Sequence, residues 1–290
     1  MHRLSTRILV ALVALGSAMM ASPAAAQLPF AFKFREGSPL FYRTVHETKV
    51  EVKQGDENAA TASIVKQLKK WDVKKIDGLG VATIELSIKE LALDNTDPSG
   101  ETLKFDSTDL AGSSPALVEQ LKGVVERPII EIQIDSTGAI KGYKHLTARQ
   151  DVLRDLPFMI TVPNERIPTV GTQWRRDFPI QLEPPLSTPA RTLRGVQNCN
   201  VVSSDSNKLV VNVESKLLDE VKAPKDMLPV VQFLPKGTVV LDPKAGKMLQ
   251  AKMTIDQTVN DFQGAGSSYK FFAQYSEELV DNVQQADTRK

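Results

Sequence analysis

Apolar residues recur at every second position along much of this chain, most clearly between residues 237 and 255. Val239 and Leu241 alternate with their neighbours, and the period of two returns after a short polar interruption. That interruption holds Pro243, which presets the first turn dihedral, and Gly246, which adopts a left-handed conformation readily. The pattern predicts two amphipathic strands joined by a tight turn.

A weaker copy of this hairpin lies between residues 130 and 143. In both copies an aspartate, Asp135 or Asp242, ends the first strand, and a glycine follows three or four residues later. Aspartate favours this position because its carboxylate accepts hydrogen bonds from nearby backbone N–H groups. We therefore interpret the two aspartates as turn residues rather than as a catalytic acid pair.

Alternation predicts further strands at Tyr42–Val52, Thr61–Ile76, Val81–Leu91, Glu101–Ser107, Thr192–Ser203, Lys208–Leu217 and Ser268–Leu279. The stretch 61–76 is ambiguous, since Ile64, Leu68 and Trp71 also fit the spacing of a helix. The glycine-rich sequence that follows at 77–80 is typical of a hairpin turn, which favours a strand at the Trp71 end.

Two short helices are expected between the strands. Pro115 after Ser114 is a favoured helix start, and Leu117, Leu121 and Val124 then repeat at helical spacing. Thr147 to Gln150 matches a capping box and predicts a second helix there. Both helices are expected to cover the apolar face of an antiparallel sheet.

Proline content divides the chain into two parts. The run from Pro157 to Pro189 is typical of a linker. Strands, a helical insert and an Asp-to-Gly hairpin occur on both sides of it, which suggests a duplicated unit. The sequence therefore predicts an α+β fold, mostly antiparallel β, with two similar sheet halves and short covering helices. The predicted boundaries are 27–157 for the first half, 158–190 for the linker, 191–283 for the second half and 284–290 for a polar tail.

Residues 1–26 have the organisation of a signal peptide. Arg3 and Arg7 precede an apolar run at 8–20, and alanines fill the positions before a predicted cleavage after Ala26. The run has 13 residues, fewer than the ~18 that a spanning helix needs. No cysteine follows the cleavage point to carry a lipid. We predict a soluble protein exported to the periplasm or beyond, not spanning the membrane.

Charge and cysteine content exclude several classes of protein. The first 26 residues hold two of the 36 basic side chains and none of the 35 acidic ones, so the remainder carries a net charge of −1. Near-neutral charge gives no electrostatic reason to expect nucleic-acid binding. The single cysteine, Cys199, cannot form an internal disulfide and is interpreted as a small buried residue.

No motif of an enzyme or a metal site is found. His46 and His145 are the histidines beyond the signal segment, and neither has a second ligand at metal spacing. There is no nucleophile elbow, phosphate loop or zinc-protease motif. We predict no catalytic, cofactor-binding or metal-ligating residue, no cofactor, and a protein that is not an enzyme.

Lysines gather around Trp71, at positions 66, 69, 70, 74 and 75. A polyanion patch would need an uninterrupted basic surface, but Asp72 and Asp77 divide this cluster. A solvated sheet face or a protected sheet edge is the preferred interpretation. Trp71 and Trp174 are interpreted as core residues rather than a ligand platform.

Three short motifs stand out in the sequence: Phe34-Arg-Glu-Gly37 before Phe41-Tyr42, Trp71-Asp-Val73 leading into Asp77-Gly78, and Pro168-Thr-Val-Gly-Thr-Gln-Trp174. Together they resemble a family of exported bacterial proteins of unknown function, common in planctomycete-type bacteria. The resemblance implies an exported β-rich domain and assigns no catalytic residue.

Three hypotheses for function remain open. The first is a binding module that holds a hydrophobic ligand or an envelope component on a concave sheet face. The alternative is an envelope interaction or scaffold protein that uses its sheet edges. The third is a hydrolase assembled from scattered residues, which would require His46 or His145 to meet a carboxylate and a serine.

Overall fold

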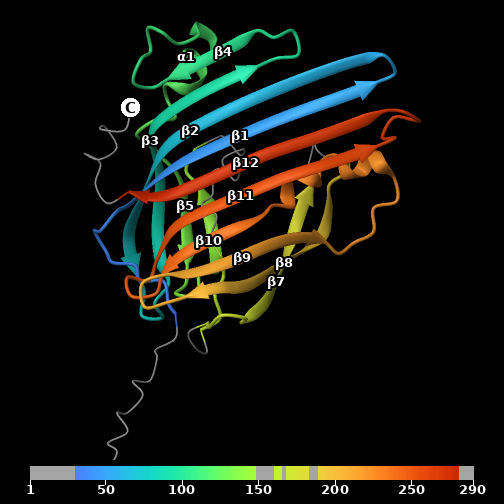
Figure 1. Cartoon of the computed structure of the whole chain (residues 1–290). Coiled ribbons are helices and arrows are strands. Elements are labelled where there is room, and N and C mark those ends of the chain that lie inside the picture. The colour runs from blue at the N-terminus through green and yellow to red at the C-terminus, as the bar shows by residue number, and fades with distance from the viewer. Residues whose placement is uncertain (1–29, 148–159, 165–167, 183–188, 281–290) are drawn as a thin grey trace, which may run out of the picture.

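A computed structural model describes residues 30–147, 160–164, 168–182 and 189–280. Its strands form one twelve-stranded sheet, in the spatial order β6-β5-β3-β2-β1-β12-β11-β10-β9-β8-β7, with β4 paired to β3 (Figure 1). All pairings between these strands are antiparallel. The strands are β1 (Leu40–Gln54), β2 (Glu57–Ile76), β3 (Ala82–Thr96), β4 (Thr102–Asp106), β5 (Pro128–Ile134), β6 (Ile140–His145), β7 (Gln173–Leu182), β8 (Arg191–Ser204), β9 (Leu209–Leu217), β10 (Lys236–Asp242), β11 (Lys247–Asn260) and β12 (Ser268–Val280).

The prediction of an α+β fold with two sheet halves is wrong. β1 pairs with β12 over thirteen residue pairs, from Phe41↔Val280 to Lys53↔Ser268, and this pairing joins both parts of the chain into one sheet. Each hairpin is a local feature that alternation and turn residues reveal. The β1–β12 pairing joins strands more than 200 residues apart, and no local pattern indicates it.

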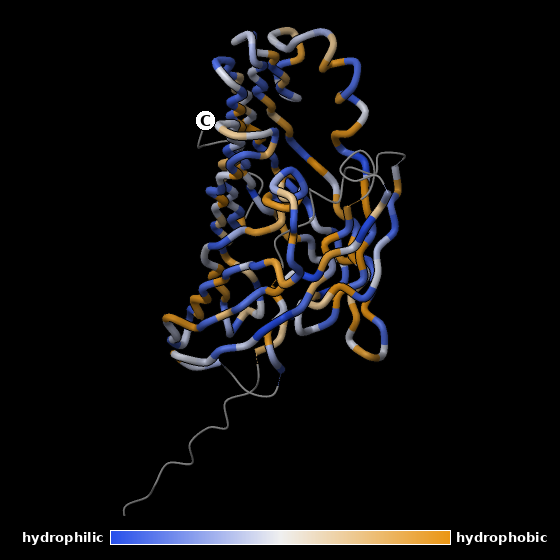
Figure 2. The backbone as a smooth tube through the Cα atoms, turned by 90° about the vertical axis from the view of Figure 1, so that its right-hand side faces the viewer, coloured by the Kyte–Doolittle hydropathy of each residue, from blue (hydrophilic) through white to orange (hydrophobic). Residues whose placement is uncertain are grey.

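Helices cover little of the sheet. Among the described residues they are α1 (Pro115–Leu121) and two short 3₁₀ turns, η2 (Pro224–Met227) and η3 (Val231–Phe233). The sheet instead buries its apolar face by folding over itself, so that β1, β2 and β3 form one wall and β8 and β9 the opposite one (Figures 1 and 2). We call the face turned toward the interior the inner face.

One main hydrophobic core occupies this interior. Buried side chains reach it from both walls, among them Trp71 and Ile84 on one side and Val211 and Val213 on the other. The predicted alternation in Val81–Leu91 is confirmed, because Ala82, Ile84, Leu86 and Ile88 all point into this core. The apolar face is thus buried by the curvature of the sheet itself, and not by covering helices as predicted.

The N-terminal segment, residues 30–34, closes one end of the interior. The Phe32 N–H donates to Ser136 O at 2.7 Å and the Lys33 N–H donates to Gly246 O at 2.9 Å. The segment therefore lies between the β5–β6 turn and the β10–β11 turn, which are the two Asp-to-Gly turns of the sequence. Phe30, Phe32 and Phe34 contact one another in series, with ring centroids 5.1 and 6.3 Å apart. We call this the closed end.

Glycine is required at both turns because the segment approaches them closely. Gly138 has φ +87° and Gly246 has φ +61°. A Cβ on Gly138 would meet Ile160 O and the Phe32 ring, and a Cβ on Gly246 would meet Ala31 O. A side chain at either position would therefore combine backbone strain with a clash.

Some of the sequence predictions concern residues outside the described ranges. The signal segment 1–26, most of the helix predicted at Thr147 and the tail 284–290 lie outside the described residues.

The stretch 61–76 is strand, as the turn at 77–80 indicated. The range 158–190, predicted as a linker, contains β7, an edge strand that tolerates Pro179 because only one side pairs. No helix in the described parts of the chain is long and apolar enough to cross a membrane.

Candidate functional site

At the end of the interior opposite the closed end, several inner-face side chains are only half-buried. The β1–β2 and β11–β12 turns lie at this open end (Figure 1). We define the open-end face as the inner-face residues of four neighbouring strands there. They are His46, Thr48 and Val50 of β1, Ser63 and Val65 of β2, Leu93 and Asn95 of β3, and Phe271 and Tyr275 of β12. His46 is exposed and the others are half-buried, while Ala273 between the two β12 residues is buried, as are most inner-face residues toward the closed end.

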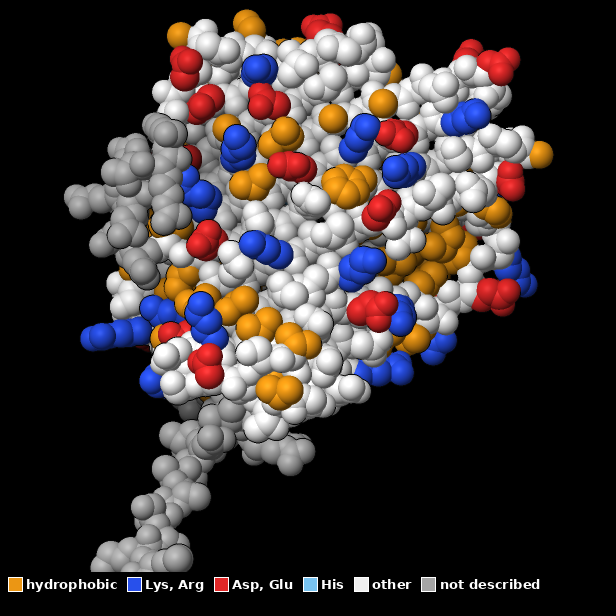
Figure 3. Space-filling view, in the orientation of Figure 1, with side chains coloured by type: hydrophobic (Ala, Val, Ile, Leu, Met, Phe, Trp, Pro, Cys, Tyr) orange, Lys and Arg blue, Asp and Glu red, His pale blue; other side chains and the backbone are white. Residues whose placement is uncertain are grey.

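Short segments cover both sides of the open-end face. On one side, α1 packs Leu117 and Leu121 into the core with Phe105 of β4. On the other side, Val231 of η3 packs with Val259 and with Phe271. Figure 3 shows the outer face of the same wall, where acidic and basic side chains are interspersed and apolar ones gather beside η2 and η3. The open-end face thus mixes apolar and polar side chains between two apolar supports.

A row of buried polar side chains separates the open-end face from the core. Thr44, Gln67, Lys69 and Glu277 are between 0 and 7% exposed. Cross-strand pairing of Thr44 with both Gln67 and Glu277 places these residues on the inner face, and Lys69 pairs with Tyr42 in the next row. We call these four residues the polar band.

Hydrogen bonds tie the polar band to its surroundings. Thr44 Oγ1 donates to Gln67 Oε1 at 3.3 Å, and the Tyr275 hydroxyl donates to Glu277 Oε2 at 2.7 Å. The ring of Tyr275 also contacts that of His46, with centroids 6.0 Å apart. Tyr275 therefore links the buried carboxylate to the exposed part of the open-end face.

Burying the ionisable side chains of the polar band would be energetically unfavourable if they had no polar partners. Lys69 and Glu277 are side chains of opposite charge type on the same face, one on each side of β1, and buried groups of this kind require polar partners. Burial, and secondarily the negative charge of Glu277, raises the pKa of Tyr42 far above its usual value. Tyr42 instead donates its hydroxyl hydrogen to Met248 O at 3.0 Å. The polar band is therefore a layer of buried, hydrogen-bonded polar side chains that adjoins the open-end face.

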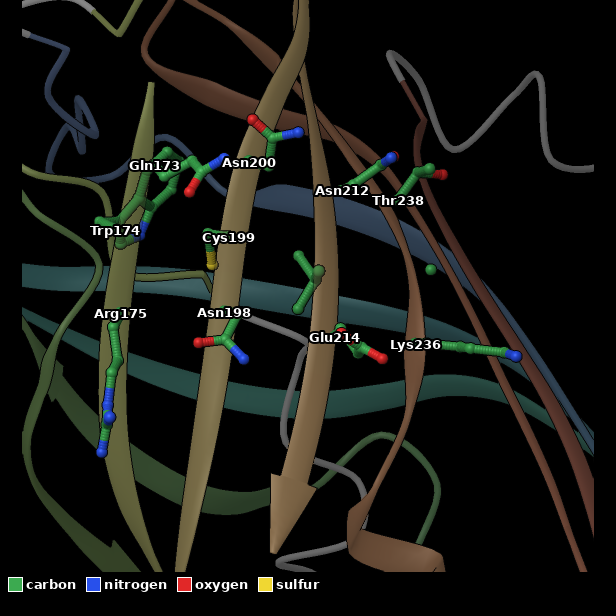
Figure 4. A pocket seen from close by; sticks show the side chains of 12 residues that line it. Gln173, Trp174, Arg175, Asn198, Cys199, Asn200, Asn212, Glu214, Lys236 and Thr238 are labelled. Carbon is green, nitrogen blue, oxygen red and sulfur yellow. The ribbon is translucent and has the colours of Figure 1, made fainter. Parts of the chain in front are cut away.

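A separate hollow of about 740 Å³ lies on the outer face of β7, β8, β9 and β10 (Figure 4). Exposed polar side chains line it, including Gln173, Arg175, Asn198, Asn212, Glu214 and Lys236. We call it the outer hollow. No sequence motif marked it, because its residues come from four strands and its polar ones are ordinary outward-facing residues of an alternating pattern.

The two histidines do not form a common site. His46 lies on β1 and His145 on β6, and three strands lie between them in the sheet. His145 contacts the ring of Tyr143, with centroids 5.6 Å apart. Within the described ranges, no group of three His, Cys, Asp or Glu side chains is placed to hold a metal ion.

Turn chemistry is confirmed for both aspartates. Asp135 Oδ1 accepts hydrogen bonds from the N–H groups of Thr137 and Ala139 at 2.9 and 3.0 Å. Asp242 Oδ1 accepts from Lys244 and Ala245, both at 2.8 Å. Burial by itself would raise the pKa of Asp135, but hydrogen bonds from Lys141, Thr137 and the turn backbone lower it below its usual value.

The lysine cluster around Trp71 divides between the two faces of β2. Lys70 and Lys74 lie within 3.3 Å of Asp72 on the outer face, as a solvated sheet face predicts. The edge interpretation is wrong, since β2 lies between β1 and β3. Lys69 was missed as an inner residue, although it shares the phase of Trp71 along the strand.

The remaining candidates are structural. Trp71 is 1% exposed in the core, and Trp174 is half-buried with its indole Nε1–H donating to Thr161 O at 2.7 Å. Cys199 is buried as predicted, and burial raises the pKa of its thiol to about 12. A thiol that stays protonated at neutral pH is a poor nucleophile.

Comparisons with known proteins show no family. No family model and no curated protein sequence matches the chain. Among solved structures, one that describes lipid–protein interactions in lipovitellin aligns with 86% of this chain at 11% identity and a TM-score of 0.46. The aligned part is 25% of the lipovitellin chain. DynF from the dynemicin biosynthesis pathway of Micromonospora chersina aligns with 91% of the chain at 8% identity and a TM-score of 0.26. These values are too low to transfer a function to this chain.

Proposed function

We propose that this protein binds an amphipathic, lipid-like ligand on the open-end face. The observation that carries the proposal is the change in exposure along the inner face. On β2 and β3, inner-face residues are buried up to Gln67 and Leu91, and those beyond, such as Val65 and Leu93, are half-buried, although Ala273 on β12 is buried. A sheet that leaves part of its inner face accessible between two apolar supports offers apolar and polar surface for a ligand to cover.

The composition of the open-end face suits a ligand with both apolar and polar parts. Val65, Leu93 and Phe271 offer apolar contact, and Thr48 and Ser63 lie between them in the register. Covering about 300 Å² of apolar surface would contribute roughly 7 kcal/mol before the costs of association. Hydroxyl and amide groups among the apolar ones would hydrogen-bond the polar part of the ligand and fix its orientation.

The polar band supports a specific orientation of that ligand. Tyr275 and His46 lie where the band meets the open-end face, and Tyr275 is already bonded to Glu277. We infer that the polar head of the ligand contacts these two side chains, while its apolar part extends toward Val50 and Phe271. Binding, rather than chemistry, is the role that this arrangement supports.

Export remains part of the proposal. The basic start, the apolar run and the alanines before residue 27 are typical of a signal peptide, and the resemblance to an exported family points the same way. An exported protein that holds a lipid-like molecule would act as a carrier or a sensor of envelope components.

Sheet edges give a weaker basis for function. β7 is an edge strand, but it contains Pro179 and the charged residues Arg175, Arg176 and Asp177. Proline and charges on an edge strand are typical devices that prevent pairing with another chain. A scaffold role through β7 is therefore disfavoured relative to ligand binding.

Native mass spectrometry of protein purified from its own host tests the proposal. We expect a bound small molecule that denaturation releases, and we expect Val65→Glu to abolish it by placing a charge on the open-end face. Ile64→Glu is the matched control, because Ile64 is a half-buried neighbour on the outer face of the same strand. Only apo protein in the wild type, or equal loss in both variants, would contradict the proposal.

A further inference from the structure

The outer hollow carries two ordered rows of polar side chains, independent of the open-end face. Strand register places Gln173, Asn200, Asn212 and Thr238 in one row across β7 to β10. The adjacent row contains Asn198 between Arg175 and Glu214, and ends at Lys236. Neighbouring strands lie about 4.8 Å apart, so the side chains in each row are close enough to contact one ligand together. Figure 4 shows the labelled side chains projecting from successive strands.

Most of the charge in the outer hollow is neutralised by neighbours. Arg175 Nε lies 2.7 Å from Asp177 Oδ1, and this carboxylate raises the pKa of Arg175. Glu214 lies 2.9 Å from Lys216 Nζ on the same strand. Amide side chains therefore dominate the chemistry of the surface, and it gives no strong field for a polyanion.

One amide also has an unmet hydrogen-bonding capacity. Asn200 Oδ1 is buried and accepts no hydrogen bond from the part of the chain that the structure describes. A buried acceptor without a donor is unfavourable, and rotation of the half-buried Asn200 side chain toward the hollow would let a ligand hydroxyl donate to this oxygen. Amide groups both donate and accept, which matches hydroxyl groups that also do both.

We propose that the outer hollow binds a neutral oligosaccharide. Its hydroxyl groups would bridge the amides of Gln173, Asn198, Asn200 and Asn212, and the volume of about 740 Å³ is within the range of small-molecule sites. Trp174 provides no stacking platform on this face, because its indole is bonded to Thr161 O. Binding therefore depends on hydrogen bonds and is weak for a single site.

Titration with cellotetraose and chitotetraose, followed by NMR of the side-chain amide groups, tests the inference. We expect saturable shifts of the Asn198, Asn200 and Asn212 amide signals with at least one of the two sugars. Asn198→Ala and Asn212→Ala should each raise the dissociation constant about twofold to tenfold, as loss of one hydrogen bond predicts. Asn58→Ala, at an exposed position on β2, is the matched control and should leave it unchanged.

Three results would overturn the inference. The first is the absence of amide shifts with both sugars at millimolar concentration. The second is saturable binding of heparin but of neither sugar, which would identify a site for anions. The third is binding of a neutral extended peptide in place of the sugars. None of these results depends on whether the open-end face holds a lipid, so the two proposals fail separately.

Discussion

The closed end and the open end of the interior are built from the same wall of strands and differ in what covers the inner face. At the closed end, residues 30–34 insert between two turns and bury Phe30 and Phe32. At the open end, α1 and η3 pack against the two sides and leave the inner face between them half-exposed. The polar band, where Glu277 is fully buried, marks the change between the two ends.

This difference shows how one antiparallel sheet can serve both stability and binding. The apolar face of such a sheet is continuous, so a local cover decides which part becomes core and which part stays accessible. Stability is expected to concentrate at the closed end. Substitutions there should affect unfolding strongly, whereas equivalent ones at the open end should affect it less.

The largest effect on stability is expected from removing an aromatic side chain of the N-terminal segment. Phe32→Ala removes a ring that is 5% exposed and should lower the free energy of unfolding by about 3–5 kcal/mol. Phe271→Ala, at the half-buried open-end face, should cost roughly half as much or less. Urea denaturation measures both. Equal losses would contradict the assignment of the closed end as the main stabilising region.

Glycine substitutions separate backbone strain from packing. Gly246→Ala combines a positive φ with a clash against the N-terminal segment and should cost about 2–4 kcal/mol. Gly55→Ala has a similar φ of +60° but no atom within 4 Å of the added Cβ, and should cost about 1–2 kcal/mol. Thermal unfolding compares the two variants. If the Gly55 variant were as unstable as the Gly246 variant, backbone strain alone would account for the loss of stability and the clash would add nothing.

Removing one hydroxyl tests the hydrogen bond beside the polar band. Tyr42→Phe leaves Met248 O without this donor and should lower the free energy of unfolding by about 1–2 kcal/mol. Tyr143→Phe is the control, because Tyr143 is 51% exposed and should change stability by less than about 0.5 kcal/mol. If both variants unfold at the same urea concentration as the wild type, the hydrogen bond from Tyr42 to Met248 O contributes nothing to stability.

Acid should weaken the turn that holds the N-terminal segment. The folded pKa of Asp135 is below its usual value, so its contribution to stability is complete above the unfolded pKa and is lost as pH falls through the folded pKa. Asp135→Asn should cost about 1 kcal/mol at neutral pH. The difference from wild type should shrink below about pH 4. A difference that stays constant down to pH 2, far below the usual aspartate value of about 4, would contradict the lowered pKa.

Sequence patterns predict the strands and turns of this protein well because those features are local. Trp71 and Val73 set the phase of β2, and the same phase places Gln67 and Lys69 inside the sheet. Tyr275 likewise places Glu277 on the inner face two residues later. The polar band could therefore be found by extending each apolar phase into its polar neighbours.

The closure of the sheet could not be found in this way. Pairing of β1 with β12 and insertion of residues 30–34 between two distant turns are contacts between far parts of the chain. The outer hollow was equally hidden, since its amides become neighbours only through the register of four strands. Period-two patterns define faces, but they do not define which strands meet.

Photochemical labelling tests the central claim most directly, by locating a lipid-like ligand on the folded protein. A palmitic acid analogue with a diazirine on its chain would be bound, irradiated and mapped by peptide mass spectrometry. We predict labels on the open-end face, at residues such as Val50, Val65, Leu93 and Phe271. Labels confined to the outer surface, or none that saturate with probe concentration, would contradict the account.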